Sequence, residues 1–256
     1  RRLMNRKTKE IYKSVLFPIG VLLSALLIWE VASIASGKAE GSPASTMRAV
    51  MVLFGQQTFW RALSATLLRS LISFAVSFLF ALIFAIMSSK VDTVRRILAP
   101  IITTIRCVPT MAVVLILIVT FKASVATVIV GMLVLFPTFY SALLPVVDSV
   151  DKQMLEAAEV YGANCWKKIV YVYMPYMRNA VIENALSGIS LAIKLIVSAE
   201  VISQAARSIG MMMQDSRMYL QSDRLIALTL VIVFICILID GVGKLVCSGL
   251  KKPNKE

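Results

Sequence analysis

The chain has 256 residues, of which 59% are hydrophobic and 16% charged, and its formal net charge is +13. This composition excludes a soluble globular domain, because only about half of such a domain is apolar. The strict period-two alternation of a β-barrel is missing, so we expect an all-α polytopic membrane protein. The excess of Lys and Arg is typical of positive-inside topology and contact with membrane lipid, and we expect no nucleic-acid partner.

Sequence features of metal sites and of ATP hydrolysis are also missing. The chain contains no His, and its four cysteines show no paired spacing (Cys107, Cys165, Cys236 and Cys247). We therefore expect no metal, haem or disulfide framework. No GxxxxGK[ST] phosphate loop occurs, so the chain is not expected to hydrolyse ATP or to act as an enzyme.

Six apolar segments are each long enough to cross a hydrocarbon core of about 30 Å as a helix. In chain order, the hydrophobic pattern predicts spans at about 15–36, 63–88, 98–120, 125–147, 180–203 and 225–247. Seventeen Lys and Arg lie in the two termini and the even-numbered connections, against seven in the odd-numbered connections. This asymmetry predicts that both termini lie in the cytoplasm.

The spans divide the chain into three expected parts. Residues 1–62 would hold a basic cytoplasmic tail, a retained first helix and an outer linker with a short interfacial helix or plain coil. Residues 63–247 would form a core of five transmembrane helices, with a long cytoplasmic connection at about 148–179. Residues 248–256 would form a second cytoplasmic tail.

The cytoplasmic connection at about 148–179 is amphipathic and unusually aromatic. Acidic residues precede Ala157 and Ala158, Gly162 then interrupts the helical pattern, and Lys167 and Lys168 follow. We expect a short helix, a break, and a second amphipathic piece that ends at Pro175. Its aromatic side chains are suited to a protein interface. The alternative is a segment that rests on the inner leaflet.

This connection resembles a known family motif. Glu156-Ala157-Ala158, three residues, Gly162, nine residues, then Val172-Tyr173-Met174-Pro175 is similar to the EAA signature of ABC-importer permeases. The segments RCVPTMAVVLILI (106–118) and IKLIVSAEVI (193–202) resemble the nitrate/sulfonate/taurine-type branch of these permeases.

The resemblance implies the type I ABC importer permease fold, with six transmembrane helices in the bacterial plasma (inner) membrane. Its EAA residues would form coupling helices that seat on a cytoplasmic ABC ATPase dimer, and they are Glu156, Ala157, Ala158, Gly162, Val172, Met174 and Pro175. An extracytoplasmic substrate-binding protein and a second permease copy, forming a homodimer, would complete the importer. The permease would bind no cofactor, and ATP and Mg would lie on the ATPase.

Polar residues inside the predicted fifth span are candidates for a translocation pathway. Glu183, Ser187, Ser190, Lys194 and Ser198 share one helical face. A lysine at the centre of a membrane helix costs about 2.5–3.5 kcal/mol, so we expect Lys194 to meet an anionic solute or to pair with Glu200 or Glu183. We assign Arg106 and Glu200 to the same pathway. The alternative is that such serines join neighbouring helices, as could Thr66, Ser70, Ser73 and Ser77 of the second span.

Three other functions stay open from the sequence. The same architecture could import a thiamine-precursor-like pyrimidine or another heterocycle instead of a nitrate-, sulfonate- or taurine-like anion. From another class, the chain could be an ATP-independent secondary carrier, although no internal repeat is detectable. A non-transport scaffold would leave the EAA spacing unexplained.

Overall fold

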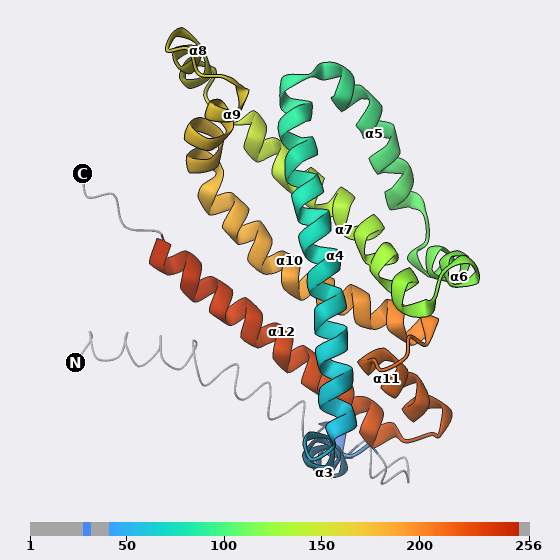
Figure 1. Ribbon diagram of the computed structural model, residues 1–256. Coiled ribbons are helices and arrows are strands. Elements are labelled where there is room, and N and C mark those ends of the chain that lie inside the picture. Colours follow the sequence, from blue (N-terminus) through green and yellow to red (C-terminus); the bar gives the residue numbers. More distant parts are fainter. Residues whose placement is uncertain (1–27, 32–40, 251–256) are drawn as a thin grey trace, which may run out of the picture.

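The computed structural model describes residues 28–31 and 41–250, and every regular element within those ranges is a helix (Figure 1). After residues 28–31, the elements are α3 (Pro43–Phe54), α4 (Gln57–Lys90), α5 (Asp92–Cys107), α6 (Thr110–Thr120), α7 (Ala123–Asp148), α8 (Lys152–Val160), α9 (Cys165–Lys168), the π-helix η2 (Ile169–Tyr173), α10 (Met174–Ser203), α11 (Ile209–Met218) and α12 (Ser222–Leu250).

Four helices in the described ranges are long and apolar enough to cross a membrane. They are α4, α7, a continuous helix at 166–203 that includes α10, and α12, and they confirm the spans expected at about 63–88, 125–147, 180–203 and 225–247. The bent pair α5 and α6 raises this number to five if the pair is one span. The first expected span, at about 15–36, lies outside the described residues apart from 28–31.

The span expected at about 98–120 is not one continuous helix. Its two parts, α5 and α6, meet at an angle of 93°. The break falls at Val108 and Pro109, both of which have extended backbone with ψ of 127° and 123°. Proline has no N–H to donate and disfavours helical geometry at the residue before it, so the helix ends at Cys107 and restarts at Thr110.

The centre of the bundle is the close packing of α4 against α7, with α10 lying against both. Small residues make this approach possible: a Cβ added at Gly131 of α7 would lie 2.8 Å from Ser73 Oγ and 2.7 Å from Ile196 Cδ1. The hydroxyls of Ser73 and Ser77 donate to the α7 carbonyls of Val128 and Met132. Ser73 and Ser77 therefore join α4 to α7, as the alternative interpretation of this stripe states, whereas the Ser70 hydroxyl donates to the Thr66 carbonyl of its own helix.

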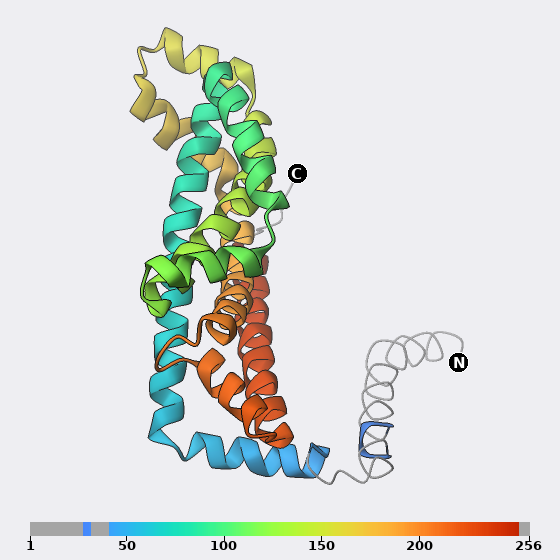
Figure 2. The ribbon, with the colours of Figure 1, turned by 90° about the vertical axis from the view of Figure 1, so that its right-hand side faces the viewer.

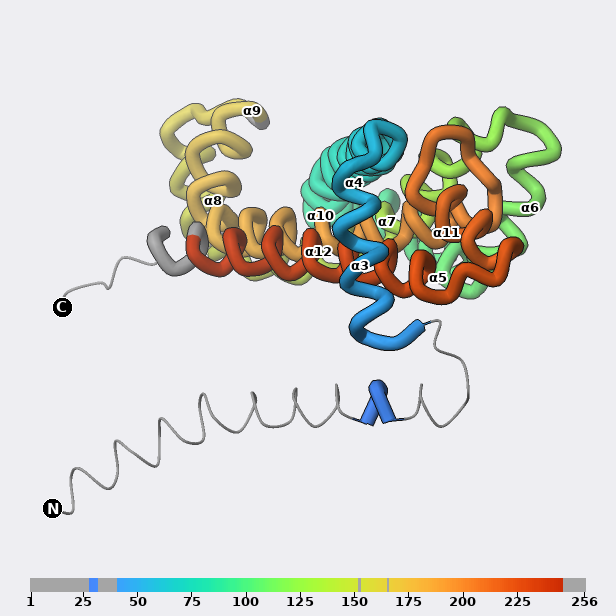
Figure 3. Tube along the Cα trace, turned by 90° about the horizontal axis from the view of Figure 1, so that it is seen from below, coloured from blue at the N-terminus to red at the C-terminus, as the bar shows by residue number. Residues whose placement is uncertain are grey.

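The two ends of the bundle carry different elements. Helices α8 and α9 lie beyond the end at which α4 finishes, whereas α3 and α11 lie at the opposite end (Figure 1). Helix α3 confirms the short helix expected in the outer linker, and it begins with a cap in which Ser42 Oγ accepts from Ser45 N at 3.2 Å. It lies across the start of α4 and packs against α12 (Figures 2 and 3).

Candidate functional site

The EAA segment, Glu156–Pro175, begins as helix α8 and turns sharply at Gly162. The Gly162 N–H donates to the Glu159 carbonyl at 2.9 Å, and the Ala163 N–H donates to the Ala158 carbonyl at 2.9 Å. These two bonds form a Schellman motif, in which the residue after the helix cap adopts a left-handed conformation. Gly162 has φ +68°, a conformation that is unfavourable for most residues with a side chain. The expected helix break at Gly162 is thus confirmed.

An ion pair joins the two arms of this turn. The Lys168 ammonium donates to the Glu159 carboxylate, and the pairing holds the pKa of that carboxyl below its usual range. At the base of the segment, the Tyr176 hydroxyl donates to the Ser149 carbonyl at 2.8 Å. The turn is therefore tied both across its arms and to the end of α7.

The sequence predicts that the second amphipathic piece ends at Pro175. The structure shows that this prediction is wrong. Helix α9, η2 and α10 follow one another without a gap, and a single helix extends from Trp166 to Ser203. Pro175 lies in the first turn of α10, directly after η2. Because proline donates no N–H and displaces the carbonyl four residues earlier, the helix widens here into a π turn and continues.

One side of the segment packs on the bundle and the other is exposed. Leu155, Ile169 and Val172 pack against the core cluster formed by α4, α5, α7 and α10. The exposed side carries large apolar side chains, with exposed fractions of 86% for Val160, 90% for Tyr161, 71% for Trp166 and 75% for Tyr171. Glu156, Ala157, Met174 and Pro175 are exposed as well, and Ala158 is partly exposed. Such a concentration of exposed apolar and aromatic surface is typical of an interaction site, and it suits either of the two expectations, a partner protein or the inner leaflet.

The polar face predicted on the fifth span is divided between exposed and buried positions. On α10, Ser187, Lys194 and Ser198 are exposed, and both serines donate to carbonyls of their own helix. Ser190 is buried, and its hydroxyl contacts Asp240 of α12. Ser190 thus joins helices, while the other three residues form a polar stripe on the exposed side of α10.

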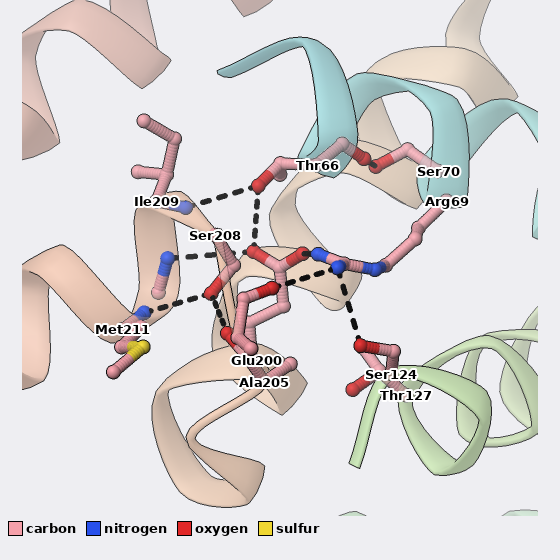
Figure 4. A network of polar contacts seen from close by, with 12 residues as sticks. Thr66, Arg69, Ser70, Ser124, Thr127, Glu200, Ala205, Ser208, Ile209 and Met211 are labelled. Atoms are coloured by element: carbon pink, nitrogen blue, oxygen red, sulfur yellow. Dashed lines mark hydrogen bonds and ion pairs between the residues drawn. The ribbon is translucent and has the colours of Figure 1, made fainter. Parts of the chain in front are cut away.

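Glu200 lies in a buried polar network at the other end of the bundle (Figure 4). Its carboxylate is fully buried and lies 2.7 Å from the Arg69 guanidinium of α4. Thr66 Oγ1 donates to the same carboxylate at 2.8 Å, and the Gly210 N–H does so at 3.3 Å. The expected pairing of Lys194 with Glu200 is therefore wrong, because the closer Arg69 occupies the carboxylate.

Arg69 extends this network to two further elements. Its Nη2 donates to Ser124 Oγ at the start of α7 at 3.2 Å and to the Ala206 carbonyl before α11 at 3.0 Å. The backbone approaches closely here: a Cβ on Gly210 would lie 2.3 Å from Glu200 Cβ. The network consequently joins α4, α7, α10 and α11 at one point, and Glu200 is buried away from the exposed stripe of α10.

Arg106 lies at the bend between α5 and α6. Its side chain is exposed, and Nη2 donates to the Pro137 carbonyl of α7 at 3.2 Å. The contact ties the bend to the middle of α7, which places Arg106 on a different element from Lys194. The structure thus does not bring the predicted pathway residues together as one cluster.

Comparison with known proteins identifies the family. Residues 77–252, more than half of the chain, match the family model described as the binding-protein-dependent transport system inner membrane component. The chain belongs to this family. It is therefore a multi-pass inner membrane permease subunit of a binding-protein-dependent ABC importer, and the secondary-carrier and scaffold alternatives are excluded.

Two curated permeases resemble this one over long stretches. It is 26% identical to the taurine transport system permease protein TauC of Escherichia coli (strain K12), over 89% of this chain and 86% of that protein. It is 30% identical to the trimethylamine N-oxide transport system permease protein TmoV of Pelagibacter ubique (strain HTCC1062) over 66% of this chain, which spans 23% of that protein.

A solved structure shares the fold of this permease. The crystal structure of a bacterial ABC transporter involved in the import of the acidic polysaccharide alginate matches 96% of this chain and 100% of its own, with a TM-score of 0.70 and 15% identity. Permeases of this family are not catalytic and bind no cofactor, because ATP is bound and hydrolysed on a separate subunit. A partner ATPase and a binding protein follow from the family.

Sequence reasoning does not predict the contacts that two polar residues of this permease make between helices. Asp240 is a single acid within the apolar run of α12, and its contact with Ser190 is not predictable from spacing within one helix. The sequence pattern places Thr66 in a stripe with Ser70, Ser73 and Ser77. In the structure, Thr66 Oγ1 also accepts a hydrogen bond from the Ile209 N–H of α11 at 3.0 Å. The unusual feature that could have singled out Asp240 is a charge inside a membrane-length apolar segment.

Proposed function

We propose that this permease moves a small organic anion of the sulfonate type, with a taurine-like solute favoured over nitrate, into the cytoplasm by alternating access. The observation that carries the proposal is Lys194, a lysine inside a membrane-length helix whose side chain is exposed on a stripe with Ser187 and Ser198. Among the described residues, no carboxylate lies within ion-pair distance of its ammonium. Such a charge favours an anionic solute.

The relatives support the same solute class. One of them is a taurine transport permease, and its similarity extends over most of both chains. A sulfonate has three oxygen acceptors, which the three donors of a lysine ammonium can bind. Ser187 and Ser198 would add donors to the solute by turning their hydroxyls from the α10 carbonyls that they contact. On this account the α10 stripe lines the pathway, while Ser190, Glu200 and Arg106 support the helices around it.

Coupling to ATP is proposed to pass through the EAA segment. Glu156, Ala157 and Ala158 on α8, Gly162 at the turn, and Val172, Met174 and Pro175 beyond it would seat the segment in a groove of the ATPase dimer. The exposed Tyr161 and Trp166 would provide rigid apolar contact area. The ties between Lys168 and Glu159 and between Tyr176 and Ser149 would transmit movement of this segment into α10 and α7.

The complete importer would contain two copies of this permease, with the α10 stripe facing the pathway between them. The binding protein would deliver solute at the end that carries α3 and α11, and both termini would lie in the cytoplasm, as the distribution of Lys and Arg indicates.

Uptake into proteoliposomes tests the solute class. The permease, its ATPase and candidate binding proteins are reconstituted, and ATP-dependent uptake of labelled taurine, an alkanesulfonate, nitrate and a thiamine-precursor pyrimidine is measured. We expect uptake of taurine or the alkanesulfonate, and we expect Lys194→Met to reduce it by roughly tenfold or more. Uptake of the pyrimidine alone, or an unchanged rate and apparent affinity in Lys194→Met, would contradict the proposal.

A further inference from the structure

Asp240 is a carboxylate within the apolar helix α12 that the coupling and anion-binding roles do not use. Asp240 lies five residues before the end of the apolar span at 222–245, and a carboxylate inside such a span is unfavourable unless it has a partner or a function. The Ser190 hydroxyl donates to Asp240 Oδ1 at 2.5 Å. This neutral partner positions the carboxylate but does not neutralise its charge.

Basic residues do not pair with Asp240 in the part of the chain that the structure describes. Lys244, one helical turn further along α12, and Lys194 on α10 both lie beyond ion-pair distance from its oxygens. The carboxylate is partly exposed, so it lies at the edge of the helix packing and not within it. A charged group at such an edge is available to a solute.

Asp240 lies beside the polar stripe of α10. Ser190 and Lys194 are one turn apart on α10, separated by about 40° around the helix axis. The Ser190 hydroxyl contacts both Asp240 and the carbonyl of Cys236, and the Cys236 thiol donates back to the Ser190 carbonyl at 3.9 Å. Ser190 is therefore the link between the exposed stripe and α12.

Lys194 and Asp240 each lie one helical turn from the contact between α10 and α12. Lys194 follows Ser190 by four residues on α10, Asp240 follows Cys236 by four residues on α12, and the Ser190 hydroxyl contacts the Cys236 carbonyl. Because α10 and α12 run in opposite directions (Figure 1), Lys194 lies toward the α11 end and Asp240 toward the α8 end. Helical geometry separates the two charges by roughly 5–10 Å along the bundle.

We propose that Lys194 and Asp240 form a recognition site for a zwitterionic solute, in which Lys194 binds the anionic group and Asp240 binds an alkylammonium group. This inference rests on the proposed function, because it requires the α10 stripe to line the pathway. It adds a second recognition residue and a narrower solute class: a short molecule whose ammonium and anionic groups are separated by a few bonds. Opposite charges at this spacing favour such a molecule over a simple anion, whose approach the Asp240 carboxylate opposes.

Taurine and isethionate are a matched pair of probes, because they differ only in an ammonium group against a hydroxyl group. Equilibrium dialysis of each labelled probe with the purified permease–ATPase complex, without binding protein, isolates the selectivity of the permease. We expect wild type to bind taurine roughly tenfold or more tighter than isethionate. Asp240→Asn should bind the two equally, Asp240→Glu should retain the preference, and Lys194→Met should weaken both.

The exposed Asp215 of α11 provides the control, and Asp215→Asn should behave as wild type. Equal loss of both probes in Asp240→Asn, an unchanged preference in that variant, or no taurine binding by wild type would overturn the inference. If Asp240→Asn does not yield an intact complex, loss of the preference in Asp240→Glu would overturn it. Failure of the proposed function is distinguishable, because wild type would then take up no sulfonate into proteoliposomes.

Discussion

The Glu200 carboxylate lies 2.7 Å from the Arg69 guanidinium and is fully buried. Around this pair, Thr66, Ser124 and the Gly210 N–H supply hydrogen bonds from α4, α7 and the start of α11. A buried ion pair stabilises only when its remaining hydrogen-bonding positions are filled, and this pair meets that condition. The pair thus fixes the end of the bundle that faces away from the EAA segment.

Removing both partners of this pair should destabilise the permease by less than the sum of the losses from removing each one alone. Glu200→Gln leaves the Arg69 charge largely buried without a counter-ion, which typically costs about 3–5 kcal/mol. Replacing Arg69 by Met as well removes the unpaired charge, so the double variant should lose less than the sum of the two single losses. The apparent melting temperature of the purified complex measures each effect.

The exposed Asp215 serves as the control for charge alone, because Asp215→Asn removes an acid that forms no ion pair within the described part of the chain. Its melting temperature should equal that of wild type. Strictly additive losses in the Arg69 and Glu200 variants would show that the pair is not a unit.

The turn of the EAA segment should depend on backbone conformation at position 162. No atom lies within 4 Å of a Cβ built on Gly162, so a side chain meets no steric obstacle within this chain, and φ +68° is the constraint. Asn adopts this conformation readily, whereas β-branched residues do not. We expect Gly162→Asn to retain much of the ATP-driven uptake and Gly162→Val to lose most of it. Equal loss in both variants would instead assign the effect to side-chain bulk at the ATPase surface.

Close packing of α4, α7 and α10 should make Gly131 intolerant of even a methyl group. In Gly131→Ala, the new Cβ would lie 2.7 Å from Ile196 Cδ1 and 2.9 Å from Ser73 Cβ, so the helices must separate. We expect a loss of about 1–3 kcal/mol, the range typical of overpacking. The control is Gly241→Ala on α12, where a Cβ meets no atom within 4 Å. That variant should keep or raise the melting temperature, because Ala favours helix over Gly, and a matching loss in both variants would contradict the packing account.

The exposed aromatic residues of the EAA segment should hold the ATPase. Tyr161→Ala and Trp166→Ala should each weaken retention of the ATPase subunit during purification, with a loss of about 1–2 kcal/mol per anchor. Tyr219, which is 76% exposed on the opposite end of the bundle, is the matched control, and Tyr219→Ala should retain the ATPase fully. Equal retention in all three variants would show that the aromatic surface has another use.

Hydrophobic pattern predicts the long helices well, because a membrane-length apolar run can satisfy its backbone only as a helix. The pattern fails at Val108 and Pro109, where apolarity continues although the chain bends by 93°. It also fails at Pro175, where proline at the start of α10 follows a π turn and does not end the helix.

Motif spacing predicts the turn at Gly162, because a left-handed residue at the end of a short helix strongly favours glycine. Partners across helices are less accessible to sequence reasoning. Helical periodicity places Ser190 and Lys194 on one face, but it does not show which of them a neighbouring helix covers. The pairing of Glu200 with Arg69, separated by 131 residues, depends on how α4 and α10 pack and not on any local pattern.

The rate of ATP hydrolysis by the reconstituted complex tests most directly whether the EAA segment couples the ATPase to this permease. The rate is measured in lipid nanodiscs with and without the loaded binding protein, for wild type and for Glu156→Lys, with permease and ATPase quantified in each sample. We predict that the loaded binding protein stimulates the wild-type rate and that Glu156→Lys abolishes this stimulation while the permease stays in the membrane fraction. Stimulation that is equal in both proteins, or a wild-type permease with which no ATPase subunit co-purifies, would contradict the account.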